Sequence, residues 1–309
     1  MLRSMYSGIG GMRGFQTKLD VIGNNIANVN TVGFKKSRVV FSDILSQTIS
    51  GGNAANQNPD NGPIVGGTNP KQVGLGSTLS GIDVIHTPGS PMTTGNTTDF
   101  AITGNGFFVV SPIENLTEEE NAENFLLTRA GNFTRDSDNN LVLNGMFVIG
   151  ADGRKINLNY GDPDAEVDPT KTVTQFSVGE DGTITVNYGD GTTDRSKKIG
   201  IALVNNPAGL EKVGGSAYRV TAAANGNDPD STKLKVLEEG GTPEGAGVFI
   251  APATAMGRGK VIQGQLEMSN VDLSEEFTEM IVAQRGFQAN SRIITTSDSI
   301  LEELVNLKR

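Results

Sequence analysis

The two ends of this 309-residue chain carry apolar residues at helical spacing, and the long stretch between them does not. At each end the stripe positions are separated by steps of three and four residues, which places them along one face of a helix; at the C-terminal end Gln284, Ser291 and Asp298 dilute the stripe. The N-terminal stripe consists of Leu2, Met5, Ile9, Met12, Phe15, Leu19, Ile22, Ile26 and Val29, and the C-terminal stripe of Leu273, Phe277, Met280, Phe287, Ile294, Leu301 and Val305. Because an apolar helix face is stabilised mainly by packing, each end needs a partner.

Five glycines lie inside the predicted N-terminal helix, at positions 8, 10, 11, 14 and 23. Each costs a helix about 1 kcal/mol relative to alanine, so together they cost about 5 kcal/mol. We therefore expect this helix to form only when a neighbour covers it. Gly8, Gly11 and Gly14 recur every three residues, which predicts a bare strip where another helix can approach closely.

Asparagines cluster where the N-terminal helix should end, in the stretch VIGNNIANVNTVGFKK. Their amides can satisfy backbone groups that a helix end leaves unpaired. Gly33 can adopt the left-handed conformation that redirects the chain, and Phe34 can anchor the turn in an apolar pocket. We interpret the stretch as a joint that fixes the angle between helix and following chain; an ordinary helix C-cap is the alternative. The joint residues are Asn24, Asn25, Asn28, Asn30, Thr31, Gly33 and Phe34.

Between the ends the pattern changes to short apolar runs separated by turns, which is typical of β-structure. The stretch DFAITGNGFFVV predicts a hairpin that turns at residues 104–106, and Asn144-Gly145 and two Asp-Gly pairs predict further turns. Residues 50–77 are instead rich in Gly, Asn and Pro, which favours irregular, extended chain.

These patterns predict an α+β chain of three parts. Residues 1–30 and 272–309 form an inner helical polymerisation domain, residues 31–75 and 255–271 an extended linker region, and residues 76–254 an all-β outer domain. We expect the helices to pair with each other and with those of neighbouring copies. The alternative is a monomer whose helices pack on the β domain.

The sequence offers little material for catalysis or metal binding. It has no cysteine and one histidine, His86, so thiolate and multi-histidine metal sites are excluded. The run GIGGMRG lacks the spacing of a phosphate-binding loop, and residues 136–140 lack the glycine and glutamate of a calcium loop. We predict no catalytic, cofactor-binding or metal-binding residues. A carbohydrate-binding or enzymatic β domain remains the alternative class, although the chain has no tryptophan and only four tyrosines.

Charge and hydropathy limit the partners. The net charge of −10 argues against nucleic acid, and no apolar run approaches the roughly 20 residues that span a membrane. The first 30 residues show no cleavage site of a secretory signal peptide. Residues 1–50 hold six Lys/Arg against two Asp/Glu, whereas residues 272–309 hold four against seven, so the ends carry opposite charge. That asymmetry favours pairing of the ends, and chance is the alternative.

Several stretches resemble the bacterial flagellar rod and hook proteins, in order and over most of the chain. The most specific are NNIANVNTVGFKKSR near the N-terminus and the long segment VIQGQLEMSNVDLSEEFTEMIVAQRGFQANSR before the C-terminus. Within the family, NVNTVGFKKSRVVFSDILSQT looks closer to hook than to distal-rod sequences. Many hook proteins carry a sizeable insertion in the β domain, however, and only residues 155–175 are available for one here. The distal rod is therefore the alternative.

The resemblance implies a fold, a role and partners. The terminal helices of many subunits would form concentric tubes around an export channel, with the β domain outside. A hook subunit would self-assemble into a curved, flexible tube that joins rod to filament and transmits torque. Its partners would be its own copies, the rod protein, the hook cap, the hook-filament junction proteins and the type III export apparatus. It would lie outside the cell in the flagellar hook or basal body, after export without a cleaved signal peptide.

Overall fold

The computed structural model describes residues 2–54, 66–116, 124–160, 172–226, 232–236 and 248–307. The chain forms two units. The first, here the helical unit, comprises Met1–Ala27, Ser37–Asp83 and Asp272–Arg309; the second, the β unit, comprises Asn28–Lys36 and Val84–Val271. The chain therefore passes from one unit to the other at four points, after residues 27, 36, 83 and 271.

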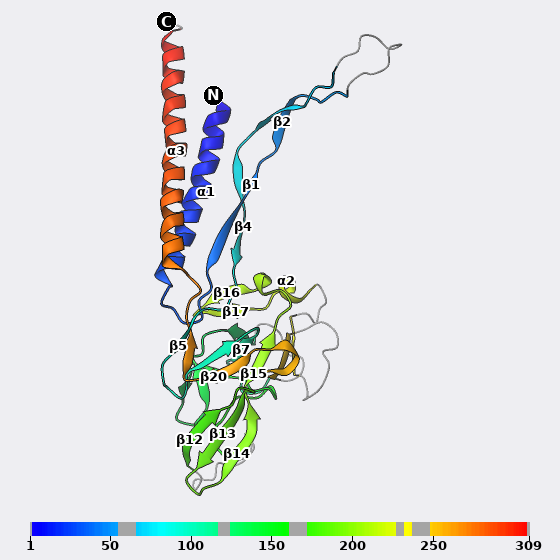
Figure 1. Cartoon of the computed structure of the whole chain (residues 1–309), viewed down its shortest axis with the longest axis vertical. Helices are drawn as coiled ribbons and strands as arrows, with labels where there is room; N and C mark the ends of the chain where they lie inside the picture. The colour runs from blue at the N-terminus through cyan, green and yellow to red at the C-terminus, as the bar shows by residue number, and fades with distance from the viewer. Residues whose placement is uncertain are drawn as a thin grey trace. The chain divides into compact units, whose positions relative to one another are not determined.

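A helix stands at each end of the chain. Helix α1 (Leu2–Ala27) and helix α3 (Leu273–Asn306) lie side by side and antiparallel within the helical unit, as Figure 1 shows in blue and in orange to red. The Asp272 side chain caps α3 by accepting hydrogen bonds from the backbone N–H groups of Ser274 and Glu275, at 2.8 and 3.4 Å. The predicted α+β class, with a helix at each end and a mostly β middle, is confirmed.

The glycine strip of α1 admits close neighbours, as predicted. A methyl group on Gly8 would lie 3.3 Å from the Ile294 side chain, and one on Gly11 would lie 2.9 Å from the Asn290 amide. Gly14 instead faces the ring of Phe41, which would lie 2.6 Å from a methyl group at that position. Two glycines of the strip therefore contact α3, and the third contacts a strand.

The segment predicted as extended linker contains paired strands. Strand β1 (Ser37–Asp43) pairs with β4 (Ser77–Val84), and β2 (Ser46–Ser50) pairs antiparallel with β3 (Lys71–Gly74). We call residues 37–83 the arm. Its partner strands lie 20 or more residues apart, so their pairing is not visible in the local Gly, Asn and Pro composition. Residues 55–65 of the predicted linker lie outside the described residues.

The β unit is built around one large sheet. Its strands follow the order β16 (Glu211–Gly214), β17 (Ala217–Arg219), β8 (Leu126–Thr128), β7 (Phe107–Ser111), β11 (Met146–Val148), β10 (Leu141–Leu143) and β9 (Thr134–Arg135). Strand β15 (Gly200–Leu203) joins it by pairing with β7, and β19 (Val248–Pro252) and β18 (Leu234–Val236) continue from β15.

Smaller sheets and short helices complete the unit. Strands β12 (Val173–Val178), β13 (Thr183–Tyr188) and β14 (Thr193–Lys198) form a meander; β20 (Lys260–Gln263) pairs with β6 (Phe100–Thr103), and β21 (Gln265–Glu267) pairs with β5 (Pro91–Thr93). Helix α2 (Ala222–Asn225) and the 3-10 helices η2 (Pro207–Gly209) and η3 (Ala255–Gly257) are single turns. Residues 255–271, predicted as extended linker, contain the short strands β20 and β21, whose partner strands lie more than 150 residues away.

The structure confirms one of the predicted turns and contradicts another. Asn144 and Gly145 both have positive φ, 50° and 83°, and connect β10 to β11 as the Asn-Gly pair predicts. The hairpin predicted at residues 104–106 is wrong, since β6 pairs with β20 and β7 pairs with other strands. The glycines there redirect the chain instead of reversing it, and Gly106 packs against Ile201 with no room for a side chain. Residues 161–171, most of the predicted insertion region, lie outside the described residues.

Candidate assembly surfaces and buried joint

The joint residue Asn25 is buried in the helical unit, where its side chain forms hydrogen bonds with two other elements. Its side chain is 1% exposed, and its amide oxygen accepts a hydrogen bond from the backbone N–H of Ser37 at 3.0 Å. The amide nitrogen donates to the Ser37 carbonyl at 2.9 Å and to the Glu276 carboxylate at 3.2 Å. One side chain thus ties the end of α1 to the start of β1 and to the first turn of α3, whereas Asn24 is exposed.

The remaining joint residues belong to the β unit. A hydrogen-bonded turn runs from Asn28 to Phe34: the Thr31 hydroxyl and N–H donate to Asn28, and the Phe34 N–H donates to the Thr31 carbonyl. Gly33 has a φ of +67°, and a Cβ there would lie 2.5 Å from the backbone nitrogen of Ala130. The Phe34 ring is buried beneath the Lys212 ammonium, 4.4 Å from the ring centroid, and Asn30 is exposed. Gly33 thus lies in a tight turn, and the buried Phe34 ring anchors that turn.

A buried ionic cluster beside this turn was not predicted from the sequence. Lys35, Arg129 and Glu267 are each at least 95% buried. One Glu267 oxygen accepts from the Lys35 ammonium and from the Gly89 N–H, and the other accepts from Arg129 at 3.2 Å. The Glu267 carbonyl also accepts from the Gly33 N–H at 2.8 Å, so one residue holds the turn, residues 87–89 and residue 129 together. We call these three charges the ionic hub.

Two cations share one carboxylate in the ionic hub. Lys35 also donates to the Thr87 carbonyl at 2.8 Å, and Arg129 donates to the Gly104 carbonyl at 2.7 Å. Burial lowers the pKa of Lys35, and Glu267 opposes that shift. Burial lowers the pKa of Arg129 in the same way, again opposed by Glu267. Isolated charges between apolar strand residues, as in LLTRAG and QLEMSN, are the only sequence signal that marks these positions.

His86 lies beside the ionic hub, between the rings of Phe107 and Tyr218 at centroid distances of 5.7 and 5.2 Å. Burial and, to a smaller extent, the nearby cations Lys35, Arg129 and Lys212 lower the pKa of His86 to about 4, against an opposing effect of the Pro207 backbone. His86 is therefore a neutral histidine packed between two aromatic rings.

The His86 environment makes the β unit less stable in acid. Because the folded-state pKa lies below the unfolded value of about 6.5, the unfolded chain binds the proton more tightly, and stability is lost as pH falls from 6.5 toward 4. Replacing His86 with phenylalanine removes this proton-binding site. The change in the free energy of unfolding that the substitution causes should therefore be more favourable at pH 5 than at pH 7.5 by about 1 kcal/mol, after allowing for partial solvent screening. Urea titrations of both proteins at the two pH values measure this; parallel pH profiles would contradict it.

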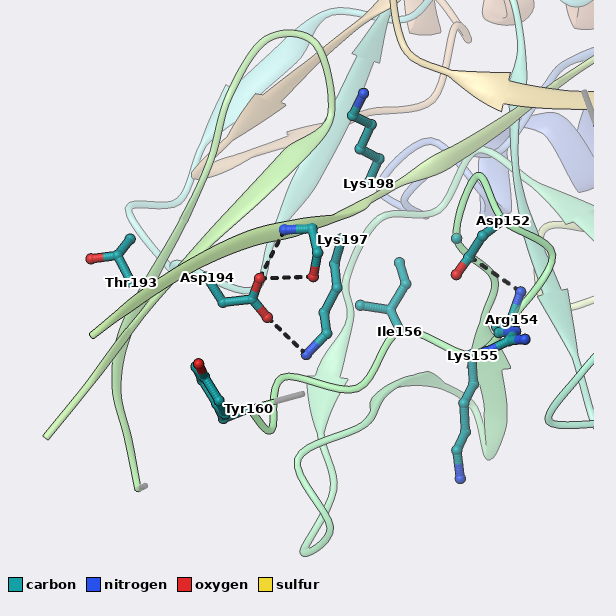
Figure 2. Close-up of a pocket in the computed structure, with 11 residues that line it drawn as sticks. Asp152, Arg154, Lys155, Ile156, Tyr160, Thr193, Asp194, Lys197 and Lys198 are labelled. Carbon is teal, nitrogen blue, oxygen red and sulfur yellow. Dashed lines mark hydrogen bonds and ion pairs between the residues drawn. The ribbon is translucent and has the colours of Figure 1, made fainter. Parts of the chain in front are cut away.

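A cavity of the β unit has a volume of about 510 Å³ and is lined by charged and polar residues together with Ile156 and Tyr160. Figure 2 shows Lys197 directed at Asp194, with Lys198 pointing away from that pair. Lys197 contacts Asp194 at 3.4 Å and donates to the Asn159 carbonyl, and Lys155 pairs with Glu114 at 2.8 Å. Asp194 also accepts hydrogen bonds from the hydroxyl and the backbone N–H of Ser196, at 2.7 and 2.9 Å, so these polar groups hold one another within the cavity wall. The described residues also contain no cluster of three His, Cys, Asp or Glu side chains that could hold a metal ion.

The predicted helix stripes are only partly used inside the chain. On α1, Ile22 is buried and Phe15 packs onto Gly286, whose Cβ would lie 2.5 Å from the ring. On α3, Ile294 packs against Gly8, whereas four members of the predicted stripe are exposed. Those four are Leu273, Phe277, Phe287 and Val305. The contact between the helices therefore combines glycines and polar residues with a few stripe residues, since Phe15 packs onto Gly286 and Ile294 onto Gly8.

Further apolar side chains on the helical unit are exposed. On α3 they include Ile281, Val282, Ile300 and Leu304, and on the arm Leu45 and Ile49 are 84% and 68% exposed. Exposed apolar side chains gathered on elements of this kind indicate surfaces that other protein chains cover. Among the described residues, no helix has both the length and the apolar character that crossing a membrane requires.

A helix pair whose apolar side chains are exposed is typical of one class of protein, the structural subunit that neighbouring chains complete. Three family models match the chain in order. They are described as flagella basal body rod protein, over residues 5–35; flagellar hook protein FlgE/F/G D1 domain, over residues 101–186; and flagellar basal body rod FlgEFG protein C-terminal, over residues 262–307.

Curated relatives agree over the full length. The chain is 47% identical to the flagellar basal-body rod protein FlgG of Bacillus subtilis over 310 positions, with all of both chains covered. It is 34% identical to FlgG of Agrobacterium fabrum, with 97% of each chain covered, and 30% identical to the flagellar hook protein FlgE of Borreliella burgdorferi, with all of both covered. The chain therefore belongs to the flagellar rod and hook FlgE/F/G family, whose members are axial structural subunits and not enzymes. The resemblance seen in the sequence is confirmed.

Proposed function

We propose that this protein is a distal rod subunit of the flagellar basal body. The observation that carries the proposal is alignment length. The FlgG relative of Bacillus subtilis aligns over 310 positions, whereas the FlgE hook relatives of Borreliella burgdorferi and Treponema pallidum require 477 and 478. This chain has 309 residues, so at least 477 − 309 = 168 positions of a hook alignment have no counterpart in it. This favours the rod over the hook interpretation drawn from the sequence.

The arm supports the same proposal on physical grounds. Strands β1 and β4, and β2 and β3, hydrogen-bond to each other along the segment where an extended linker was expected. Paired strands resist bending more than an unpaired chain does, because bending must break backbone hydrogen bonds. A stiff arm suits a subunit of a straight shaft, whereas a hook must bend as it rotates.

The exposed apolar faces indicate how such a subunit polymerises. We propose that stripe residues left uncovered by the chain's own helices, including Phe277 and Val305, contact neighbouring copies. A heterologous contact that does not close on itself builds a helical tube. On this proposal the partners are other copies of the chain, the type III export apparatus that delivers it and the hook at its outer end. The hook cap and the hook-filament junction proteins belong to the hook interpretation instead.

Deletion of the gene tests the rod assignment in cells that make this protein. Electron microscopy of purified basal bodies should show shortened rods without hooks, and expression of the chain from a plasmid should restore both. Deletion of the hook subunit in the same strain is the matched control, and it should leave rods of full length. Full-length rods in cells lacking this chain would overturn the proposal.

A further inference from the structure

Contacts between α1 and α3 recur at intervals of seven residues on both helices. Ser4 lies 3.4 Å from Ser297 between their hydroxyl oxygens, Gly11 meets the Asn290 amide, and Asn25 bonds to Glu276. Ser4, Gly11 and Asn25 are separated by seven and fourteen residues, and so are Ser297, Asn290 and Glu276. The two residue numbers of each pair therefore add up to 301. A constant sum is the signature of one antiparallel register held along the whole helix pair.

These contacts use small and polar residues, and several of them are buried. Glu276 is 5% exposed and Ser297 is 7% exposed, and Asn25 is more deeply buried than either. The predicted apolar stripe of α1, including Met5, Ile9 and Met12, is only half-buried. We infer that the pairs Ser4–Ser297, Gly11–Asn290 and Asn25–Glu276, here called the register contacts, select α3 as the partner of α1 and fix their alignment. The apolar stripes are thereby left for contacts between copies.

Comparison with a register shifted by one heptad shows why these contacts favour the observed alignment of the helices. Phe15 sits on Gly286, a pair that also adds up to 301. A slip of one heptad, to a sum of 308, would place Phe15 opposite Ile293 and Asn25 opposite Ala283. A phenylalanine would then meet a branched side chain where it now meets a bare glycine, and the buried Glu276 would lose the Asn25 amide. An apolar stripe tolerates such a slip, whereas polar groups at fixed positions do not, as single buried asparagines in coiled coils show.

Asn25 couples this register to the arm. Its oxygen and nitrogen both bond to the Ser37 backbone while the same nitrogen reaches Glu276. A primary amide supplies both the acceptor and the two donors that this arrangement uses. Neither a carboxylate nor an apolar side chain of similar size can do so. Asn25 is therefore the positioning residue of the helical unit, since it aligns α1, β1 and α3 together.

Cysteine cross-linking tests the register directly, because the chain has no cysteine of its own. The full-length double variant Ser4→Cys with Ser297→Cys should form an intrachain disulfide on mild oxidation, since the two hydroxyl oxygens are 3.4 Å apart. The matched control, Ser4→Cys with Leu304→Cys, reports a slip of one heptad. We expect at least about tenfold more cross-linking in the first variant, corresponding to the loss of one buried polar contact on slipping. Non-reducing gels and peptide masses measure the yields in free chain and polymer.

Substitution of Asn25 separates the polar contacts from general helix packing. Asn25→Leu, placed in both cysteine backgrounds, should bring the two yields to within about threefold of each other, whereas Asn24→Leu at the exposed neighbouring amide should leave the ratio unchanged. If the two cysteine variants that keep Asn25 gave equal cross-linking yields, in both free chain and polymer, the proposed register would be wrong. Disulfides formed only between chains would overturn the choice of partner. A ratio that survives Asn25→Leu would overturn the role given to Asn25.

Discussion

Replacing Glu267 with glutamine should lower the free energy of unfolding of the β unit by about 3 to 5 kcal/mol. The change keeps the shape of the side chain but removes the one carboxylate that faces both Lys35 and Arg129. Breaking a buried ion pair on one side leaves charge in a low-dielectric interior without compensation, which costs several kcal/mol even where the intact pair adds little net stability. Here two buried cations would lose their shared partner, so the effect should lie at the upper end for a single substitution.

An exposed ion pair supplies the matched control. Glu180 contacts Lys260 at 2.6 Å, and its side chain is 70% exposed. The same chemical change, Glu180→Gln, should cost less than about 1 kcal/mol, because water already solvates both charges. Urea unfolding followed by circular dichroism compares the two variants. Losses of similar size in both would show that the ionic hub does not hold the β unit together.

Replacing Gly33 with valine should destabilise the joint by at least about 3 kcal/mol and prevent formation of tubes. The backbone at Gly33 is left-handed, which costs a residue with a side chain about 1 to 2 kcal/mol. The added Cβ would also lie 2.5 Å from the Ala130 nitrogen and 2.7 Å from the Arg129 carbonyl carbon. Both are backbone atoms of a buried strand end, so they cannot move aside as a flexible side chain could.

A substitution at Gly191 separates the cost of the left-handed backbone from the cost of the steric clash. Its φ is +84°, but nothing lies within 4 Å of the position a Cβ would take. Gly191→Val should therefore cost only the conformational term, about 1 to 2 kcal/mol, and should leave assembly intact. Chemical denaturation gives the stabilities, and electron microscopy of the two variants gives the assembly outcome. Normal tubes from Gly33→Val would show that the turn at residue 33 does not fix the joint.

Local signals in the sequence predicted the elements whose causes are local. Helical spacing of apolar residues located α1 and α3, and the Asn144-Gly145 pair located a tight turn with positive φ at both residues. Gly33 was assigned its left-handed turn because few other residues adopt that conformation. In each case the information lies within a few residues of the feature.

Long-range pairing was not predictable in this way. Strands β21 and β5 meet although more than 170 residues separate them, and the local pattern around residues 255–271 gave no indication of a partner. The ionic hub depends on three charges from positions 35, 129 and 267, which only the fold brings together. For α1 the apolar stripe was the obvious interface, yet α3 packs against Gly8 and Gly11 as well as against Phe15 of the stripe, because the glycines allow a close approach.

The opposite charges of the two ends are used at one described point in the helical unit. Lys18 of α1 lies 2.9 Å from Glu279 of α3, as the charge asymmetry of the ends favours. Both side chains are partly exposed, so this pair contributes no more than about 1 kcal/mol. Charge therefore assists the helix pair, while its specificity is assigned in our proposal to the register contacts, including that of the buried Asn25.

Electron microscopy of tubes grown from the purified full-length chain tests whether this protein is a rod subunit that polymerises through its terminal helices. The chain would be concentrated, salted out and seeded with rod fragments, and the curvature of the tubes would be measured along their length. We expect straight, stiff tubes with a central channel, as for a rod built from subunits with hydrogen-bonded arms. Curved tubes would assign the chain to the hook instead. Discrete particles, despite seeding, would contradict the account of an axial subunit whose helices are completed by its neighbours.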